Sequence, residues 1–389
     1  MNTASGNVIS AEENMRSVHD EYDYLIHLVR CAIHDQTPSE IPDGVIFDSV
    51  YNSGVLHDVA NIAFYSVEKL SVKPQDELYS KWESRKNSAV IRDINQSFAE
   101  DEIIYAFKDA DIRSIGYQGT RMKALYPERE YRTMSDIDFV IDRDRLAEAR
   151  EILEGLGYKC RDIRGVEVDG FRRPNIFVEL HTELFPENSD FYEVLPDPFD
   201  GAVEEDRGRY APSRKMFYIY NVLHIVKHYR YAGCGIRRIL DLYYLNREYR
   251  DIAESSDTAM IFDDLETGDF VRDASIIAEC WFGDGGDVPE RLFEMASVIR
   301  SAGVHGTDEK KTENALLKNK SCSGKGGKSG YIIRRAFPKK AVLEERYPVL
   351  KKHPVLTPFC YTHRFFRAAV KSRKRISAEI KTIRDTDKK

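Results

Sequence analysis

The sequence predicts an α+β protein in which a small mixed β-sheet core is flanked by N-terminal and C-terminal helical regions. Apolar residues recur at helical spacing in the first third of the chain, alternate with polar residues in a short central stretch, and then return to helical spacing. With 389 residues, of which 42% are apolar and 32% are charged, the chain is long enough for two or three domains with substantial cores.

Residues 1–112 are expected to form the N-terminal helical region. Helical periodicity covers residues 11–36, 55–70 and 77–109, and prolines interrupt the pattern between these stretches. The opening of the chain is therefore predicted to contain three helices and no strand.

Residues 113–205 are expected to form the sheet. A short strand over 113–117 leads into a helical run over 120–126, and residues 135–141 then alternate apolar and polar side chains with a period of two. Asp142 follows this strand and is a suitable N-cap for the amphipathic helix after it.

Two further strands are predicted later in the same region. Residues 166–168 and 175–181 have strand-like patterns, and Asp169 and Gly170 between them are typical of a turn. Pro174 places the second of these strands near an edge of the sheet.

The last third of the chain is expected to contain three parts. Residues 206–302 return to helical spacing and are predicted to line a cleft beside the sheet, residues 303–330 are rich in Gly, Ser, Lys and Asn and predict a flexible linker, and residues 331–389 predict a basic helical tail. Residues 310–389 contain 23 Lys and Arg against 6 Asp and Glu, although the whole chain has a net charge of -7. Such a tail either attracts an anionic partner, such as nucleic acid or anionic lipid, or is a solvated helical face.

The cysteine pattern and the hydropathy of the sequence indicate the cellular compartment and the kinds of metal site to expect. The six cysteines are scattered without a Cys-x-x-Cys pair, so we expect reduced thiols and no zinc site. The sequence contains neither a signal-peptide pattern nor an uninterrupted apolar run of about 18 residues. We therefore expect a cytoplasmic protein without a transmembrane segment.

Asp136 and Asp138 are the first candidates for chemistry. Successive side chains of a strand point to opposite faces, so both carboxylates project from one face while Ile137 and Phe139 fill the other. Two carboxylates held so close cost energy unless they share a cation or a proton, and Mg²⁺ usually takes one or two carboxylates together with substrate phosphates. The pair therefore predicts a divalent-metal site.

Glu179 and His181 are the second set of candidates. Glu179 lies in an apolar, strand-like run where an unpaired carboxylate would be costly to bury, so a role as a third metal ligand or as a base is natural. His181 is two residues further along, shares the same face, and could support the metal or contact the substrate. In the alternative interpretation, both side chains face water on a half-exposed strand.

The turn before residues 120–126 is a candidate phosphate site. Backbone N–H groups at a helix N-terminus bind phosphate well, and Gly119 would let the backbone at Thr120 approach it closely. Nearby cations could neutralise a triphosphate, although each is alternatively an ordinary surface charge. These cations are Arg121, Lys123, Arg129 and Arg132.

His224 and His228 are spaced four residues apart, so both can face one side of a helix. A zinc site would need a third ligand, and the sequence has no His-Glu-x-x-His pattern. We therefore interpret them as structural or substrate-facing histidines.

Taken in order, these motifs resemble the uncharacterised bacterial nucleotidyltransferase family of the polymerase-beta-like superfamily, over roughly residues 80–250. The segments that carry the resemblance are Gly119-Thr120, Leu125-Tyr-Pro127, Arg132, Met134-Ser-Asp-Ile-Asp-Phe-Val-Ile141, Leu156-Gly-Tyr158 and Val178-Glu-Leu-His181. The resemblance implies a glycine turn that grips phosphates, two aspartates that hold divalent metal, and a third carboxylate on a neighbouring strand.

These implied roles fall on individual residues of this chain. Residues 113–205 would be the nucleotidyltransferase core, with Asp136, Asp138 and Glu179 as the catalytic and metal-binding residues. Nucleotide binding would fall to the glycine turn, the cations near it and the histidine of the later strand. These residues are Gly119, Thr120, Arg121, Lys123, Arg132 and His181.

The reaction implied is transfer of a nucleoside monophosphate from a nucleoside triphosphate such as ATP to an acceptor hydroxyl, with release of pyrophosphate. Mg²⁺ is the expected metal, with Mn²⁺ as the alternative, and the acceptor is a small molecule, a protein or an RNA. Family members commonly have Lys at the position of Gln118, and its loss removes a possible phosphate contact. The alternative function is a catalytically degenerate nucleotide-binding or interaction protein whose basic tail binds an anionic partner.

Overall fold

In the computed structural model, the linker and most of the tail predicted from the sequence lie outside the described residues. Within the described part, no helix is both long enough and apolar enough to cross a membrane. The structure describes residues 11–163, 166–187, 189–206, 208–284, 286–303, 350, 353 and 356–362.

The chain divides into two units. Residues 1–226 and 235–304 form the first, which contains the sheet and the helices around it, and residues 227–234 and 305–389 form the second. In the described residues of the second unit, Leu350 and Cys360 are buried and pack with Tyr361. The candidate active site lies entirely in the first unit.

The N-terminal region is helical, as predicted, but it contains one helix more than expected. The stretch predicted as a single helix over 55–70 is divided between two helices, because the backbone at Asp58 turns through a positive φ of 55°. Aspartate tolerates this conformation better than most residues, and its carboxylate here binds Arg237 and Thr133. The helices are α1 (Ala11–Ile33), α2 (Phe47–Leu56), α3 (Ala60–Val67) and α4 (Asp76–Asp109).

A mixed seven-stranded sheet forms the centre of the first unit, which confirms the predicted α+β class. The strand order is β3-β4-β5-β2-β1-β7-β6; β2 is parallel to β5 and antiparallel to β1. The strands are β1 (Ser114–Ile115), β2 (Ile137–Ile141), β3 (Lys159–Ile163), β4 (Glu167–Arg172), β5 (Ile176–His181), β6 (Val203–Asp206) and β7 (Arg209–Ala211).

Three local predictions in the sheet were wrong. Pro174 was expected to place its strand near an edge, but β5 pairs with β4 on one side and with β2 on the other and so lies inside the sheet. Gly170 lies inside β4 rather than in a turn, and a Cβ at this position would lie 3.5 Å from the Tyr158 side chain, so glycine makes room for the ring. The chain instead turns between β4 and β5, at Pro174. Asp142 does not cap a helix through its side chain, because its carboxylate pairs with Arg113.

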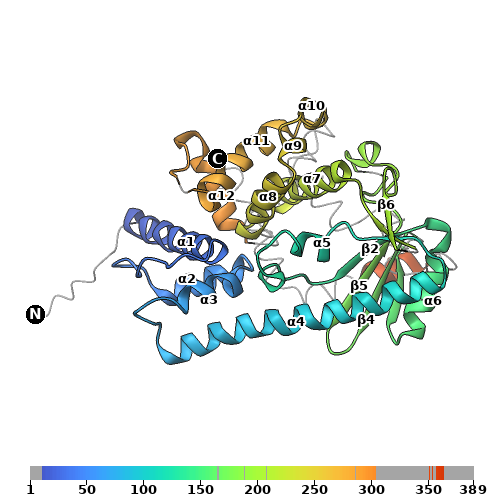
Figure 1. Cartoon of the computed structure of the whole chain (residues 1–389), viewed down its shortest axis with the longest axis horizontal. Coiled ribbons are helices and arrows are strands. Elements are labelled where there is room, and N and C mark those ends of the chain that lie inside the picture. Colours follow the sequence, from blue (N-terminus) through green and yellow to red (C-terminus); the bar gives the residue numbers. More distant parts are fainter. Residues whose placement is uncertain are drawn as a thin grey trace, which may run out of the picture. The chain divides into compact units, whose positions relative to one another are not determined.

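The sheet has one apolar face and one polar face. Ile137, Phe139 and Ile141 of β2 join a buried cluster with residues of α4 and of α6 (Leu146–Gly155), so these two helices cover the apolar face. Asp138 projects from the other face. Figure 1 shows α4 along one side of the strands, with α7 (Arg214–Ala232) and α8 (Ile236–Glu248) on the opposite side.

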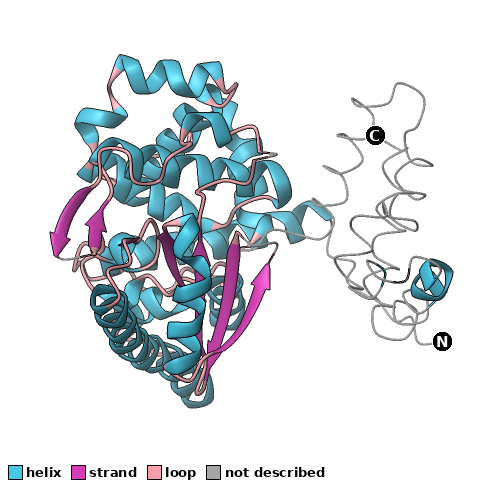
Figure 2. Ribbon diagram, turned by 90° about the vertical axis from the view of Figure 1, so that its right-hand side faces the viewer, coloured by secondary structure: helices cyan, strands magenta, loops and turns pink. Residues whose placement is uncertain are grey.

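The helices that precede and follow the sheet pack together. Helix α11 (Gly268–Phe282) contacts both α8 and α1, so helices from before and after the sheet pack directly on one another. In the view of Figure 2, the magenta strands lie among cyan helices. The other helices that follow α8 in this region are α9 (Arg250–Ala253), α10 (Ser256–Asp264), α11 (Gly268–Phe282) and α12 (Phe293–Ala302).

His57 is fully buried where these regions meet. Its Nε2 donates to the carbonyl of Arg300 at 2.8 Å, and its Nδ1 accepts the backbone N–H of Ile236 at 3.1 Å. The two bonds fix a neutral imidazole between α2, α8 and α12. Burial lowers the pKa of His57 from 6.5 to about 4, although its bond to the Arg300 carbonyl opposes the shift.

This burial predicts an acid-dependent loss of stability. The pKa of His57 is lower in the folded state, so between about pH 6.5 and pH 4 the unfolded chain binds a proton at His57 that the folded protein does not bind. Stability is therefore expected to fall as the pH decreases from about 6.5 to about 4. At about 1.4 kcal/mol per pKa unit, the loss is about 3 kcal/mol.

The measurement is urea unfolding of the wild type and of His57→Gln between pH 4 and 8. Glutamine retains a donor and an acceptor but does not titrate, so the free energy of unfolding of the variant should depend less steeply on pH. Equal slopes in the two proteins would contradict the assignment to His57.

Candidate active site

The candidate catalytic side chains meet through the pairing of β2 with β5. Asp138 lies directly opposite Glu179 in this parallel pair, so both side chains project from the same face of the sheet. His181 is two residues beyond Glu179 and shares that face, while Val178 and Leu180 are buried on the other. The register thus brings together three residues that the sequence placed on two separate strands.

These three side chains are close enough to share one ion. His181 Nε2 lies 3.4 Å from an Asp138 carboxylate oxygen and 3.5 Å from a Glu179 carboxylate oxygen. One ligand atom from each residue falls within 4.8 Å of the others, and the side chains are 22%, 35% and 28% exposed for Asp138, Glu179 and His181. Two carboxylates and an imidazole could therefore hold a divalent cation that remains open to substrate.

Asp136 lies at the edge of this group. The strand begins at Ile137 rather than at 135 as predicted, so Asp136 precedes it. Ser135 Oγ donates to the Asp136 carboxylate at 3.1 Å. Burial and the negative charge of the nearby Glu179 carboxylate raise the pKa of Asp136.

The site carries an excess of negative charge. Burial raises the pKa of Asp138, and the charge of Asp136 adds to this effect, whereas the hydrogen bond with His181 lowers it. Although burial opposes it, hydrogen bonding with Asp138 and Glu179 raises the pKa of His181 to about 10. The clustered carboxylates thus favour a positive charge among them, which a protonated imidazole or a metal ion can supply.

A glycine turn adjoins the carboxylates, as the sequence predicted. Gly119 has a φ of +56°, and a Cβ at this position would lie 3.1 Å from Met134 Sδ, so the turn needs glycine on both grounds. Thr120 begins α5 (Thr120–Lys123), which is a single turn and ends sooner than the predicted run over 120–126.

Helix α7 holds this turn through two side chains. Asn221 Nδ2 donates to the carbonyl of Tyr117 at 3.0 Å, and Gln118 Nε2 donates to the hydroxyl of Tyr220 at 3.1 Å. A cavity of about 210 Å³ adjoins the turn and is lined by Gln118 and Gly119, by Asp138 and its apolar neighbours on β2, and by residues of α4. It is smaller than the pockets of about 300–1,000 Å³ that typically enclose whole ligands.

Two of the predicted phosphate-binding cations are engaged on other elements. The Arg121 guanidinium donates to Glu205 at 2.6 Å and to the carbonyl of Tyr210 at 3.0 Å. Lys123 is 1% exposed, and its ammonium donates to Asp93 of α4 at 2.7 Å, on the side of the sheet that lies away from Asp138. A phosphate contact by either residue would therefore require it to leave a carboxylate.

The third predicted cation, Arg132, is buried in an ion pair with Asp241 of α8. Two guanidinium nitrogens of Arg132 donate to the two carboxylate oxygens of Asp241 at 2.8 and 3.2 Å. The Tyr126 hydroxyl donates to the same carboxylate at 2.7 Å. Arg132 nevertheless lies near enough to Asp138 to help lower the pKa of that carboxyl. Arg132 thus lies beside the site, but its hydrogen bonds are made to Asp241.

The sequence prediction named His224 and His228 of α7 as structural or substrate-facing residues, but it did not include Tyr220 or Asn221. Tyr220 packs near His224, with ring centroids 5.9 Å apart, and Tyr220 and Asn221 both reach the glycine turn. The spacing of four residues between Tyr220 and His224 would have placed them on one helix face. Only the fold shows that this face meets the turn.

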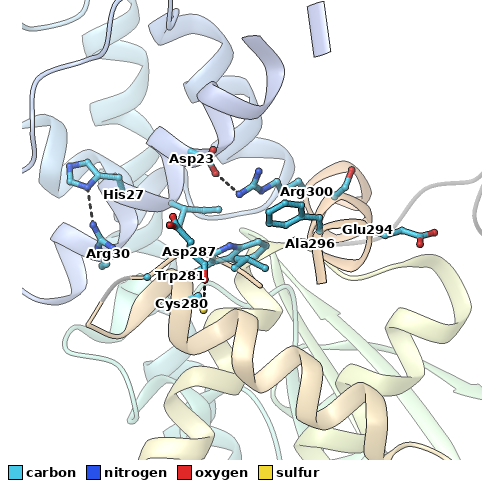
Figure 3. Close-up of a pocket in the computed structure, with 14 residues that line it drawn as sticks. Asp23, His27, Arg30, Cys280, Trp281, Asp287, Glu294, Ala296 and Arg300 are labelled. Carbon is cyan, nitrogen blue, oxygen red and sulfur yellow. Dashed lines mark hydrogen bonds and ion pairs between the residues drawn. The ribbon is translucent and has the colours of Figure 1, made fainter. Parts of the chain in front are cut away.

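A larger cavity, of about 780 Å³, lies among α1, α11 and α12. Figure 3 shows Trp281 in its wall, with Asp23 bonded to Arg300 and His27 to Arg30. No member of the Asp138, Glu179 and His181 group lines this cavity. We therefore place the chemistry at the polar face of the sheet.

The fold and this group of residues define a class of protein in which carboxylates on neighbouring strands lie beside a glycine turn. Residues 46–283 match the family described as uncharacterised nucleotidyltransferase, and the chain belongs to this family. The family implies a nucleotide substrate. No curated protein and no solved structure matches the chain.

Gly119→Ala tests the need for the tight turn. A positive φ costs a residue with a Cβ about 1–2 kcal/mol, and the added methyl would also press on Met134. Urea unfolding should show a loss of at least this size. The control is Gly155→Ala, because no atom lies within 4 Å of the Cβ position at this end of α6, and it should leave stability unchanged or raise it.

Asp241→Asn tests the buried ion pair. Removing one charge leaves Arg132 buried without its carboxylate partner, which typically costs about 3–5 kcal/mol. Asp263→Asn removes a carboxylate that pairs with Arg272 at an exposed position, so it should change the free energy of unfolding little. Equal effects of the two substitutions would contradict a stabilising role for the Arg132–Asp241 pair.

Proposed function

We propose that this protein catalyses Mg²⁺-dependent transfer of a nucleoside monophosphate from a nucleoside triphosphate to an acceptor hydroxyl. The observation that carries the proposal is the in-register pair of Asp138 and Glu179, with Asp136 beside it and the glycine turn adjacent. The chain's membership of a nucleotidyltransferase family supports the same reaction.

The donor set fits a divalent cation. Carboxylate oxygens are the preferred ligands of Mg²⁺, and an imidazole nitrogen is acceptable to Mn²⁺. Asp138 and Glu179 would hold the metal, with Asp136 as a further carboxylate and His181 as a ligand or a neighbour. When bound, the metal would neutralise charge on the phosphates and on the attacking and leaving oxygens.

The residues of the chain bind and orient the reactants. Backbone N–H groups beside Gly119 would bind the phosphates at the start of α5. The acceptor oxygen would attack the α-phosphorus, its proton would pass to the Glu179 carboxylate, and the bond to the β-phosphate would break to release pyrophosphate. Such phosphoryl chemistry depends mainly on positioning and charge neutralisation.

The acceptor would carry its hydroxyl on a small molecule, a protein or an RNA. A catalytically degenerate, nucleotide-binding protein is the second candidate function. The engagement of Arg121, Lys123 and Arg132 with carboxylates favours it, because fewer cations are available to bind a triphosphate. Binding and turnover must therefore be measured separately.

Asp138→Asn tests the proposal. The substitution keeps the size of the side chain and removes a charge, so pyrophosphate release should fall by about two to three orders of magnitude while the fold remains intact. The matched control is Asp144→Asn, an exposed aspartate shortly after the same strand, which should retain full activity.

The measurement has two parts. Calorimetric titration with each of the four nucleoside triphosphates, with Mg²⁺ and with EDTA, gives metal-dependent binding, and a screen of hydroxyl acceptors then detects pyrophosphate. Binding without turnover by any acceptor class would favour the degenerate protein. Full turnover by Asp138→Asn, or turnover in EDTA, would overturn the proposed mechanism.

A further inference from the structure

Tyr220 of α7 is held rigidly at the border of the site. Its ring packs edge-on against Tyr117 at a centroid distance of 5.2 Å, at a tilt against Phe185 at 5.3 Å, and stacked on the ring of His224 at 5.9 Å. The residue is partly exposed. These contacts fix the position of the ring and of its phenol oxygen.

The hydroxyl of Tyr220 has a hydrogen-bond donor as its partner and keeps its own proton available. A phenol offers one O–H donor and can also accept hydrogen bonds, and Gln118 Nε2 donates to it at 3.1 Å. Within the described part of the chain, no acceptor lies at hydrogen-bond distance from the Tyr220 hydroxyl. The phenol can therefore donate to a ligand without breaking a bond to the protein.

The phenol also lies in the field of the catalytic carboxylates. Burial raises the pKa of Tyr220, and the charges of Asp138 and Glu179 raise it further, against the opposing effect of Arg238. The hydroxyl thus remains protonated at neutral pH and is a neutral donor beside an acidic group.

We propose that Tyr220 contacts the substrate by donating a hydrogen bond to a phosphate oxygen of the bound nucleotide, and that Gln118 is the positioning residue that directs this donor. The inference rests on the proposed function, because it names a contact within that same site. Gln118 belongs to the same turn as Gly119 and bonds the phenol directly, so the hydroxyl of Tyr220 is held beside the glycine turn.

The engagement of the nearby cations explains why a neutral donor is needed. Each of the four cations named from the sequence binds a carboxylate of another element: Arg121, Lys123, Arg129 and Arg132. Phosphate recognition by the chain itself then depends on O–H and N–H groups, and a hydrogen bond to a charged oxygen is stronger than one between neutral groups.

The test uses Tyr220→Phe, which removes the hydroxyl and keeps the ring. Calorimetry with Mg²⁺ and the triphosphate that the wild type binds most tightly among ATP, GTP, CTP and UTP, and separately with Mg²⁺ and pyrophosphate, should show affinity weakened about 10- to 100-fold. Tyr105→Phe removes an exposed hydroxyl on α4, on the other side of the sheet, and should bind as the wild type does.

Two substitutions of Gln118 test the positioning role. Gln118→Glu presents an acceptor that attracts the phenol proton away from the substrate, so it should weaken binding as much as Tyr220→Phe does. Gln118→Leu removes the partner and leaves the phenol free to donate, so it should weaken binding less. Thermal unfolding of all variants identifies any loss that is due to misfolding, since a purely structural role would lower stability and binding together.

The outcomes separate the inference from the proposed function. Wild-type binding retained in Tyr220→Phe would overturn the inference alone, as would Gln118→Glu binding as tightly as the wild type. A wild type that binds neither a triphosphate nor pyrophosphate would overturn the proposed function and the inference with it. Weakened binding in Tyr220→Phe and Gln118→Glu, at unchanged stability, supports both.

Discussion

The parallel pairing of β2 with β5 is the constraint on which the candidate site depends. Because side chains alternate along a strand, a shift of one residue in this register would place Glu179 on the apolar face and Val178 beside Asp138. The buried residues of both strands pack against α4 and α6, so the core opposes such a shift. Burial on one face of the sheet thus fixes the chemistry on the other.

The second constraint is the attachment of the glycine turn to the helices that follow the sheet. Asn221 and Tyr220 bind the turn from α7, and Asp241 binds Arg132 from α8. The carboxylates and the turn are therefore positioned by different parts of the chain. Their relative placement depends on polar contacts that are buried or half-buried and costly to break.

Local patterns predicted much of the fold and part of the site. The alternation around Asp136 and Asp138, the isolated Glu179 and the glycine turn are local signals, and the structure brings Asp138, Glu179 and His181 together. The strands β3, β6 and β7 were missed; β6 is exposed along its length and β7 has three residues, so neither has a marked apolar face. The partners of Arg121, Lys123 and Arg132 lie 84, 30 and 109 residues away, and no local pattern identifies pairs at such separations.

Helices from before and after the sheet are held together directly. Helix α11 packs on α1, and His57 is buried between α2, α8 and α12. The sheet could not be exchanged on its own, because excising residues 113–205 would expose apolar helix surfaces and leave Asp241 without Arg132. Grafting or recombination would have to carry the helices on both sides as one piece. The stretch that matches the family, residues 46–283, extends in the same way from α2 to the end of α11.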